Sequence, residues 1–226
     1  MRTKTMRQTI RLVATTFALT MLASALIKPA QAGLKDAIAA YEAGNPQLAA
    51  KEFQACAEKG DAVCQFNLAL MHEQGMGIPK NEKEAVFWYG KSAELGNSNA
   101  QFNLGVLYEK GRGTTVDFAK ANQWYREASV QGDALAIGNL GMLYLRGDGV
   151  KVDKTAGVAL LLRSVTLDSS PANHAKANIS STRGLTPAMI AESQQLADEM
   201  GKASSLLIPL DNYLKTKTTN AAGKSK

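Results

Sequence analysis

The sequence repeats itself with a fixed period of 36 residues. The three copies span residues 62–96, 98–132 and 134–168. Matching positions carry the same residue types, as in the Asn-Leu pairs that begin at Asn67, Asn103 and Asn139. A repeat of this length is typical of stacked arrays, because one unit cannot bury its own apolar face and relies on its neighbours. The period therefore predicts an elongated array of similar units.

Each copy contains two helical segments that end at glycines. In the second copy, apolar residues recur at helical spacing over residues 100–110 and again over residues 116–130. Gly111 ends the first segment and Gly132 ends the second. The Gly-x-Gly pair at Gly111 suits a left-handed helix end, whereas a phosphate-binding loop would follow a β-strand. The pattern therefore predicts helical hairpins and gives no support to a nucleotide site.

The first 32 residues have the character of a signal peptide. Cations within residues 2–11 precede an apolar run over residues 12–27, and Ala30-Gln31-Ala32 supplies a small-x-small cleavage pattern. An uncleaved membrane anchor is the alternative, although the run is short for a span of ~20 residues. We therefore expect cleavage after Ala32, no stable membrane insertion afterwards, and a periplasmic or secreted protein.

The net charge of +6 comes from the two ends of the chain. Residues 1–32 hold five of the 26 Lys and Arg residues and none of the 20 Asp and Glu residues, so the remainder carries +1. Residues 215–226 are small, polar and basic, which predicts a disordered basic tail. Residues 33–214, the expected array with its closing helices, carry a net charge of −3. Nucleic-acid binding therefore loses its main support.

Two cysteines, Cys56 and Cys64, lie eight positions apart. An even pair in an oxidising compartment favours a disulfide. Cys56 falls near the end of one predicted helix and Cys64 in the first turn of the next, with Gly60-Asp61 forming the bend between them. A disulfide that closes so short a loop would stabilise the fold by roughly 2–3 kcal/mol in the chain-entropy model. Two buried free thiols are the alternative.

The pattern A-x-x-x-L-G-x-x-Y-x-x-G-x-G, followed by Asp, Ala and Trp-Tyr, resembles the Sel-one-like repeat (SLR) family. The resemblance covers residues 62–168 and is most specific in the second copy. The family consists of α/α repeats related to tetratricopeptide repeats. We therefore expect an all-α, right-handed α/α superhelix of about three full helix-turn-helix repeats with partial flanking units. The spacing of the two cysteines is also similar to that of cysteine-rich members, in which such pairs are bonded.

The sequence departs from the family pattern at three places. His72 replaces the tyrosine, Ala69 replaces the glycine, and Leu160-Leu161 replaces Trp-Tyr in the third copy. His72 is interpreted as the substitute for a core tyrosine. The leucine pair predicts a modified second helix where the stack ends.

The sequence offers little for catalysis or metal binding. His72 and His174 lie in no H-E-x-x-H arrangement. Cys64 and His72 would be about 12 Å apart along one helix at ~1.5 Å per residue, too far for one tetrahedral ion. No Ser-x-x-Lys pair and no Gly-x-Ser-x-Gly elbow follows residue 32. We therefore predict no catalytic residue, no metal and no cofactor.

The candidate site is a stripe along the first helix of each copy. Spacings of 3, 4, 7 and 11 place these side chains opposite those that pack inside, so a curved array would carry them on its concave face. The stripe comprises Asn67, Asn103, Asn139, Phe66, Phe102, Leu70, Val106, Met142, Lys110 and Arg146. The asparagine amides can pair with the backbone of an extended peptide, or they can bond neighbouring helices. The two phenylalanines can instead pack between successive first helices.

These observations favour an exported, non-catalytic scaffold, adaptor or regulator that binds a protein or peptide partner of the cell envelope in its concave groove. The family resemblance implies this class of activity and leaves the partner and the oligomeric state open. One alternative is a hydrolase of cell-wall or β-lactam substrates, a role linked to some cysteine-rich relatives. Another is a chaperone-like holder of exported polypeptides. A deep pocket with convergent titratable groups would favour the enzyme.

Overall fold

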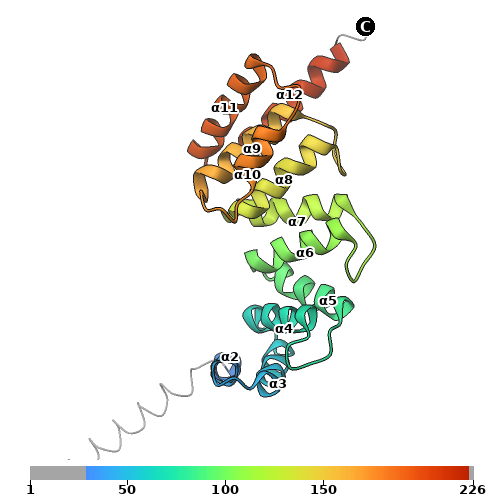
Figure 1. Ribbon diagram of the computed structural model, residues 1–226, viewed down its shortest axis with the longest axis vertical. Helices are drawn as coiled ribbons and strands as arrows, with labels where there is room; N and C mark the ends of the chain where they lie inside the picture. Colours follow the sequence, from blue (N-terminus) through green and yellow to red (C-terminus); the bar gives the residue numbers. More distant parts are fainter. Residues whose placement is uncertain (1–28, 224–226) are drawn as a thin grey trace, which may run out of the picture.

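The computed structural model describes residues 29–223 of the 226-residue chain. These residues form eleven helices and no strand. Figure 1 shows the helices stacked one after another along an elongated array. The helices are α2 (Pro29–Glu42), α3 (Pro46–Ala57), α4 (Ala62–Gln74), α5 (Glu82–Glu94), α6 (Ser98–Lys110), α7 (Phe118–Val130), α8 (Ala134–Arg146), α9 (Lys154–Leu167), α10 (Ala175–Ser181), α11 (Pro187–Lys202) and α12 (Leu207–Gly223).

Consecutive helices form the expected hairpins. α4 packs on α5, α6 on α7 and α8 on α9, and each second helix also contacts the first helix of the next pair. The pair α2–α3 precedes them as a partial unit with the same packing. This arrangement confirms the all-α repeat fold that the 36-residue period predicts.

Polar caps and left-handed glycines set the helix ends. At the start of α4, the Asp61 carboxylate accepts a hydrogen bond from the backbone amide of Cys64. At the start of α8, the Asp133 carboxylate accepts one from the backbone amide of Ala136. At the other end, Gly111 has φ 65° and its amide donates to the Leu107 carbonyl. Such caps satisfy backbone groups that a helix end leaves unpaired. The helix boundaries therefore follow directly from residue type.

The second glycine of each Gly-x-Gly pair lies against the preceding repeat. A Cβ atom on Gly77 would lie 2.2 Å from the Pro46 carbonyl oxygen, and one on Gly113 would lie 2.1 Å from the Glu82 carbonyl oxygen. Gly149 meets Phe118 in the same way. Only glycine permits so close an approach of two backbones, and its positive φ adds to the restriction. These contacts fix the spacing between neighbouring repeats.

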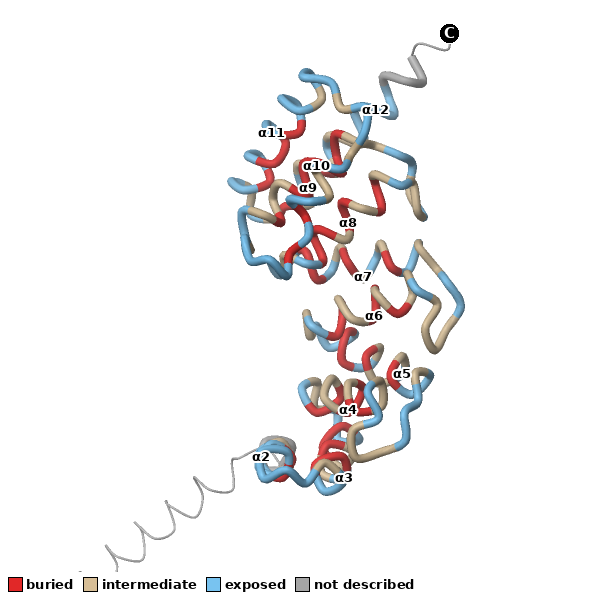
Figure 2. Tube along the Cα trace, viewed as in Figure 1, coloured by how far each residue is buried: buried red, intermediate tan, exposed pale blue. Residues whose placement is uncertain are grey.

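The buried residues follow the axis of the array as successive clusters (Figure 2). One cluster joins α2, α3 and α4, and a second joins α4, α5 and α6. The third and largest extends from α7 to α12. Every described hairpin thus buries its apolar face against its neighbours, as a repeat array requires.

The predicted disulfide is confirmed. Cys56 at the end of α3 and Cys64 in the first turn of α4 are bonded, with an S–S distance of 2.05 Å. Both side chains are fully buried within the α2–α4 cluster. The bond therefore joins the partial first unit to the first full repeat.

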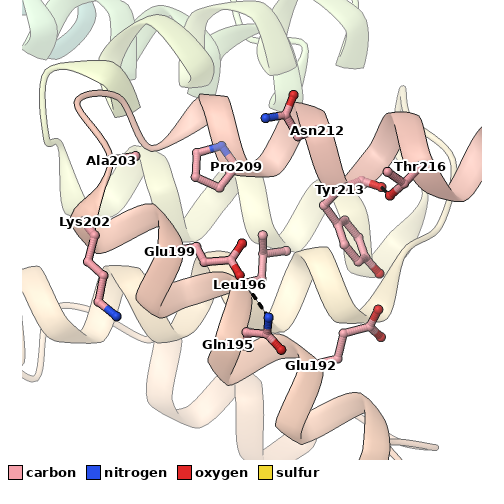
Figure 3. A pocket seen from close by; sticks show the side chains of 10 residues that line it. All are labelled: Glu192, Gln195, Leu196, Glu199, Lys202, Ala203, Pro209, Asn212, Tyr213 and Thr216. Atoms are coloured by element: carbon pink, nitrogen blue, oxygen red, sulfur yellow. Dashed lines mark hydrogen bonds between the residues drawn. The ribbon is translucent and has the colours of Figure 1, made fainter.

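Three helices close the C-terminal end of the array. α10 and α11 both pack on α9, and α12 packs on α11. Thr186 caps α11 and Pro187 occupies its first turn. Between α11 and α12 lies a cleft of about 640 Å³ (Figure 3). Its lining comprises Glu192, Gln195, Leu196, Glu199, Lys202, Ala203, Pro209, Asn212, Tyr213 and Thr216.

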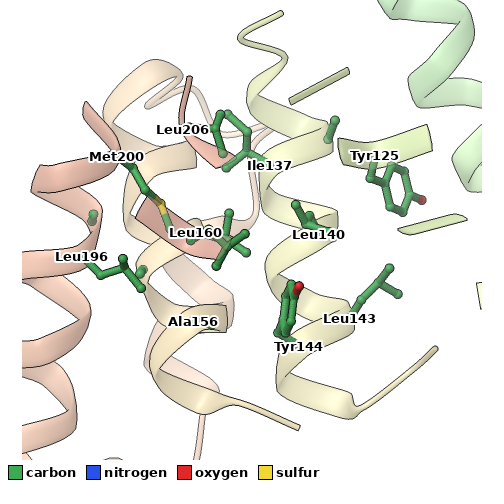
Figure 4. Packing of buried hydrophobic residues seen from close by; sticks show 14 of the residues in the cluster. Tyr125, Ile137, Leu140, Leu143, Tyr144, Ala156, Leu160, Leu196, Met200 and Leu206 are labelled. Atoms are coloured by element: carbon green, nitrogen blue, oxygen red, sulfur yellow. The ribbon is translucent and has the colours of Figure 1, made fainter. Parts of the chain in front are cut away.

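These closing helices cover one face of α9, and the corresponding face of α7 in the second repeat is exposed. Thr155, Ala156 and Ala159 are buried, whereas the side chains 36 residues earlier, such as Lys120 and Gln123, are exposed. Figure 4 shows Leu160 of α9 between leucines of α8 and α11. The leucines that replace Trp-Tyr in the third copy thus belong to a helix that is buried on more sides.

The structure corrects the prediction of a disordered tail from residue 215, because α12 continues to Gly223. Lys217 explains the difference. Its Nζ atom lies 3.5 Å from Asp153 Oδ2 and 4.7 Å from the centre of the Tyr213 ring. The ion pair with Asp153 holds the helix against the start of α9 beyond the expected boundary. Residues 224–226 lie outside the described part.

The predicted signal peptide lies largely outside the described residues. Its last four residues, 29–32, form the first turn of α2. Among the described helices, none combines the length and apolar character needed to cross a membrane.

Candidate functional site

The predicted stripe lies on one face of α4, α6 and α8. Its ten side chains are exposed or partly buried, whereas residues at the positions between them, such as Leu68, Leu104 and Leu140, are buried. The helical spacing thus separates the surface from the packed interior as expected. A binding role for this stripe remains a prediction.

An apolar row runs along the middle of the stripe. Leu70, Val106 and Met142 occupy equivalent positions of α4, α6 and α8, and all three are partly buried. Leu34 of α2 stands 36 residues before Leu70, but the buried residues of α2, Ala37 and Ala40, do not follow the register of α4. Leu34 packs on the α2–α4 cluster. The row therefore crosses the three full repeats.

The two phenylalanines border this row and also pack into the array. The Phe66 ring lies 5.7 Å from the Tyr89 ring, and the Phe102 ring lies 6.1 Å from the Tyr125 ring. Each tyrosine belongs to the second helix of the same repeat. Both phenylalanines are partly buried, so they contribute to the stack and to the surface together.

A polar cluster joins the second and third repeats beside the row. The Tyr125 hydroxyl donates to Glu109 Oε2 at 2.7 Å and accepts from Asn139 Nδ2 at 3.1 Å. Arg146 Nη2 donates to Glu109 Oε1 at 2.6 Å, and Arg146 Nε lies 2.7 Å from Asp148 Oδ2. Asn139 and Arg146, two predicted binding residues, are therefore already engaged in contacts between helices.

A related cluster joins the first and second repeats. The Tyr89 hydroxyl donates to Glu73 Oε2 at 2.8 Å, and Arg112 Nη1 donates to Glu73 Oε1 at 2.9 Å. Arg112 also binds Glu82 through two of its nitrogens. Asn103 lies beside the Tyr89 hydroxyl, at the position equivalent to that of Asn139 beside Tyr125. The tyrosine, glutamate and asparagine hold equivalent positions in the two clusters, whereas the arginines come from different positions of the repeat.

Asn67 and Lys110 differ from the other polar residues of the stripe. The Asn67 amide donates to the Val63 carbonyl of its own helix at 2.8 Å. Lys110 is exposed and makes no ion pair within the part of the chain that the structure describes. These two side chains can meet a partner without breaking a contact between repeats.

The environment of the tyrosines keeps them protonated. Burial raises the pKa of Tyr89 and of Tyr125, and the charge of the adjacent glutamate raises it further. A protonated hydroxyl is the form that donates to a carboxylate. Burial also lowers the pKa of His72, which keeps this substitute for the family tyrosine uncharged.

The cleft between α11 and α12 does not present a free acid–base pair. Glu192 accepts from the Thr155 hydroxyl at 3.2 Å, and Glu199 accepts from the Gln195 amide at 3.0 Å (Figure 3). The lining contains no serine, cysteine or histidine. Over residues 29–223, no three His, Cys, Asp or Glu side chains gather as a metal site would require. The arrangement therefore gives the hydrolase alternative no support.

Comparison with known proteins gives the repeat a name. The family model described as Sel1 repeat matches residues 62–97, 98–133 and 134–169. The chain belongs to the Sel1 repeat family. Its members are the Sel-one-like repeat proteins that the sequence pattern resembles, and they generally mediate protein–protein interaction as non-catalytic scaffolds. None of the curated proteins compared matches the chain.

Two solved structures are similar to this Sel1 repeat chain. A Sel1 repeat protein from Oxalobacter formigenes is 29% identical, with a TM-score of 0.62 over 76% of this chain and 78% of its own. The protective antigen c5321 from uropathogenic Escherichia coli strains is 24% identical, with a TM-score of 0.56. The match to c5321 covers 76% of this chain and only 41% of that protein. Both likenesses support the repeat fold.

Proposed function

We propose that this Sel1 repeat protein is an exported, non-catalytic scaffold that binds a protein or peptide along the concave face formed by α4, α6 and α8. The observation that carries the proposal is the apolar row Leu70, Val106 and Met142, which stays partly exposed through the three repeats. Contiguous apolar surface of this kind is uncommon without a partner. Exposed polar groups beside the row, such as Lys110 and the Asn67 amide, supply hydrogen-bond donors for a polypeptide.

Export rests on two features of the chain. The first is the predicted signal peptide with cleavage after Ala32. The second is the buried disulfide, which is typical of proteins that fold in an oxidising compartment. A periplasmic or secreted location follows from these two features, and the partner is then a protein or peptide of the cell envelope.

Site-specific cross-linking tests the binding face. A photoreactive residue at Val106 should capture a defined partner band from the envelope fraction. The same residue at Val130, which is exposed on α7, is the matched control and should capture none. Substituting Val106→Asp should remove capture in a pull-down, because a charge interrupts the apolar row, while Val130→Asp should leave capture intact. Equal behaviour of the two positions would argue against this face.

Export has its own experiment. Fractionation should place the chain outside the cytoplasm with its N-terminus at Gly33, as read by terminal sequencing. Retention in the cytoplasm with an intact N-terminus would overturn export while leaving the binding face to be judged by the cross-linking.

A further inference from the structure

A second cavity, of about 690 Å³, lies where the closing helices meet the third repeat. It is bordered by the loop between α8 and α9, by the first turns of α9 and α11, and by the later part of α12. Its lining comprises Tyr144, Val150, Lys151, Val152, Asp153, Lys154, Thr155, Met189, Leu214, Lys217 and Thr218. A volume of this size is usual for small-molecule sites and too small for a folded partner.

The cavity depends on the contacts of α12. Tyr213 and Lys217 of α12 both reach Asp153, at 3.2 Å and 3.5 Å. The equivalent residue of the second repeat, Asp117, pairs with Lys120 of its own helix. The cavity is thus a feature of the C-terminal end and not of the repeat as such.

Apolar side chains form the walls of the cavity. Val150 and Val152 come from the loop, Leu214 from α12 and Met189 from α11. Val152 is 51% exposed. An alkyl group in this space would cover apolar surface that water now contacts, which favours binding.

Positive charge dominates the rim. Asp153 is the one carboxylate among the lining residues, and it already accepts from the Ala156 amide and the Tyr213 hydroxyl and pairs with Lys217. Lys154 donates to a backbone carbonyl, that of Arg183, at 2.8 Å. Lys151 is exposed and takes part in no ion pair among the described residues. Two ammonium charges therefore remain without a carboxylate partner, beside the positive end of the α9 dipole.

We propose that this cavity binds a small amphiphile with an anionic head, of the chemical class of a medium-chain fatty acid. The alkyl chain lies against Val150, Val152 and Leu214, and the carboxylate faces Lys151 and Lys154. Charge complementarity favours an anion over a cation or a neutral alcohol, because only an anion compensates the two ammonium groups that lack a carboxylate partner. The inference goes beyond the proposed function and is independent of the concave face.

Titration of the full folded chain with decanoate, below its micelle concentration, tests the proposal. Calorimetry should show saturable binding of one decanoate per chain, weakening as salt is added. Decyltrimethylammonium, which has the same chain and the opposite charge, should bind at least tenfold more weakly. In amide NMR spectra the shifts should gather at residues 150–155 and 214–218. No saturable binding, or equal binding of the two probes, would overturn the proposal.

Matched variants separate the cavity from general surface effects. Val152→Asp places a charge in the wall and should weaken decanoate binding at least tenfold. Val116→Asp, at the equivalent and equally exposed position of the second repeat (53%), should leave it unchanged. Combining Lys151→Glu with Lys154→Gln should also weaken binding at least tenfold while the melting temperature stays near that of the parent. Wild-type affinity in the lysine variant, or an equal loss in both aspartate variants, would count against this site.

Discussion

The two ends of the array bury their apolar faces in different ways. At the N-terminal end, half of the buried residues in the cluster of α2, α3 and α4 are alanines, and the Cys56–Cys64 disulfide lies among them. At the C-terminal end, leucines of α8 and α9 meet the large side chains of α11 and α12. Alanine buries little apolar area, so the first cluster gains less from burial than the second. The covalent bond therefore stabilises the end that has the weaker core.

The sharpest way to break this comparison is to remove a large side chain from the C-terminal cluster. Leu210 of α12 is fully buried, so Leu210→Ala should lower the free energy of unfolding by about 2–5 kcal/mol. Ile208→Ala, on the same helix but 52% exposed, is the control and should change it by less than about 0.5 kcal/mol. Urea unfolding followed by circular dichroism measures both. Equal small effects would show that α12 adds little to the core.

Reduction of the disulfide tests the N-terminal end. The oxidised protein should carry no reactive thiol, and reductant should lower the free energy of unfolding by roughly 2–3 kcal/mol. Hydrogen exchange of α2 and α3 should rise more than that of α8 and α9. The Cys56→Ser, Cys64→Ser double variant is the control, and its stability should not respond to reductant. Reductant-insensitive stability in the parent would contradict the role assigned to the bond.

The tyrosine clusters between the ends predict a pH effect. Tyr125→Phe and Tyr89→Phe should each lower the free energy of unfolding by about 1.5 kcal/mol at neutral pH, because each removes a hydrogen bond to a carboxylate. Folding raises the pKa of both tyrosines. Their contribution is therefore complete below the unfolded pKa of about 10 and is lost as the pH rises above it.

Stability measured between pH 8 and pH 11 checks the sign of this effect. The parent should lose free energy of unfolding above about pH 10, whereas the double phenylalanine variant should lose less. Parallel curves for the two proteins would mean that the tyrosines do not couple to the fold.

The smallest expected change in stability comes from the asparagines, and it distinguishes a role in binding from a role in the packing of repeats. Asn139→Ala should lower the free energy of unfolding by about 0.5–1.5 kcal/mol, because the Asn139 amide donates a hydrogen bond to the Tyr125 hydroxyl across a helix interface. Asn67→Ala should leave the melting temperature nearly unchanged, since its amide bonds only its own helix. If Asn67→Ala weakens partner capture at unchanged stability, the Asn67 amide serves binding. If capture is unaffected, the Asn67 amide does not serve binding.

Much of the fold follows from the period of 36 residues. It predicts the hairpins, the glycine helix ends and the exposed face of α4, α6 and α8. The closing helix α11 follows from Thr186 and Pro187. α10 and the full length of α12 do not follow, because they are stabilised by contacts with α9 and α11 that have no counterpart in the repeat.

The polar clusters were harder to predict because their arginines do not share a register. Arg112 reaches Glu73, whereas the corresponding glutamate, Glu109, is bound by Arg146 and not by the residue equivalent to Arg112. A pairwise signal was nevertheless present in the sequence. Where leucine replaces the tyrosine at Leu161, leucine also replaces the glutamate, at Leu145. Such paired replacement indicates that the two positions contact each other across the hairpin.

The close contact of Gly113 with the Glu82 carbonyl has a consequence for how repeats can be added to such an array. Duplicating one complete 36-residue unit would recreate the same backbone contact at the new junction, so arrays of other lengths are accessible in a single step. A short insertion inside a hairpin would instead move the glycine away from its carbonyl and misalign every unit beyond it. The contact of Gly113 therefore allows the number of repeats in such an array to vary while the spacing between neighbouring repeats stays constant.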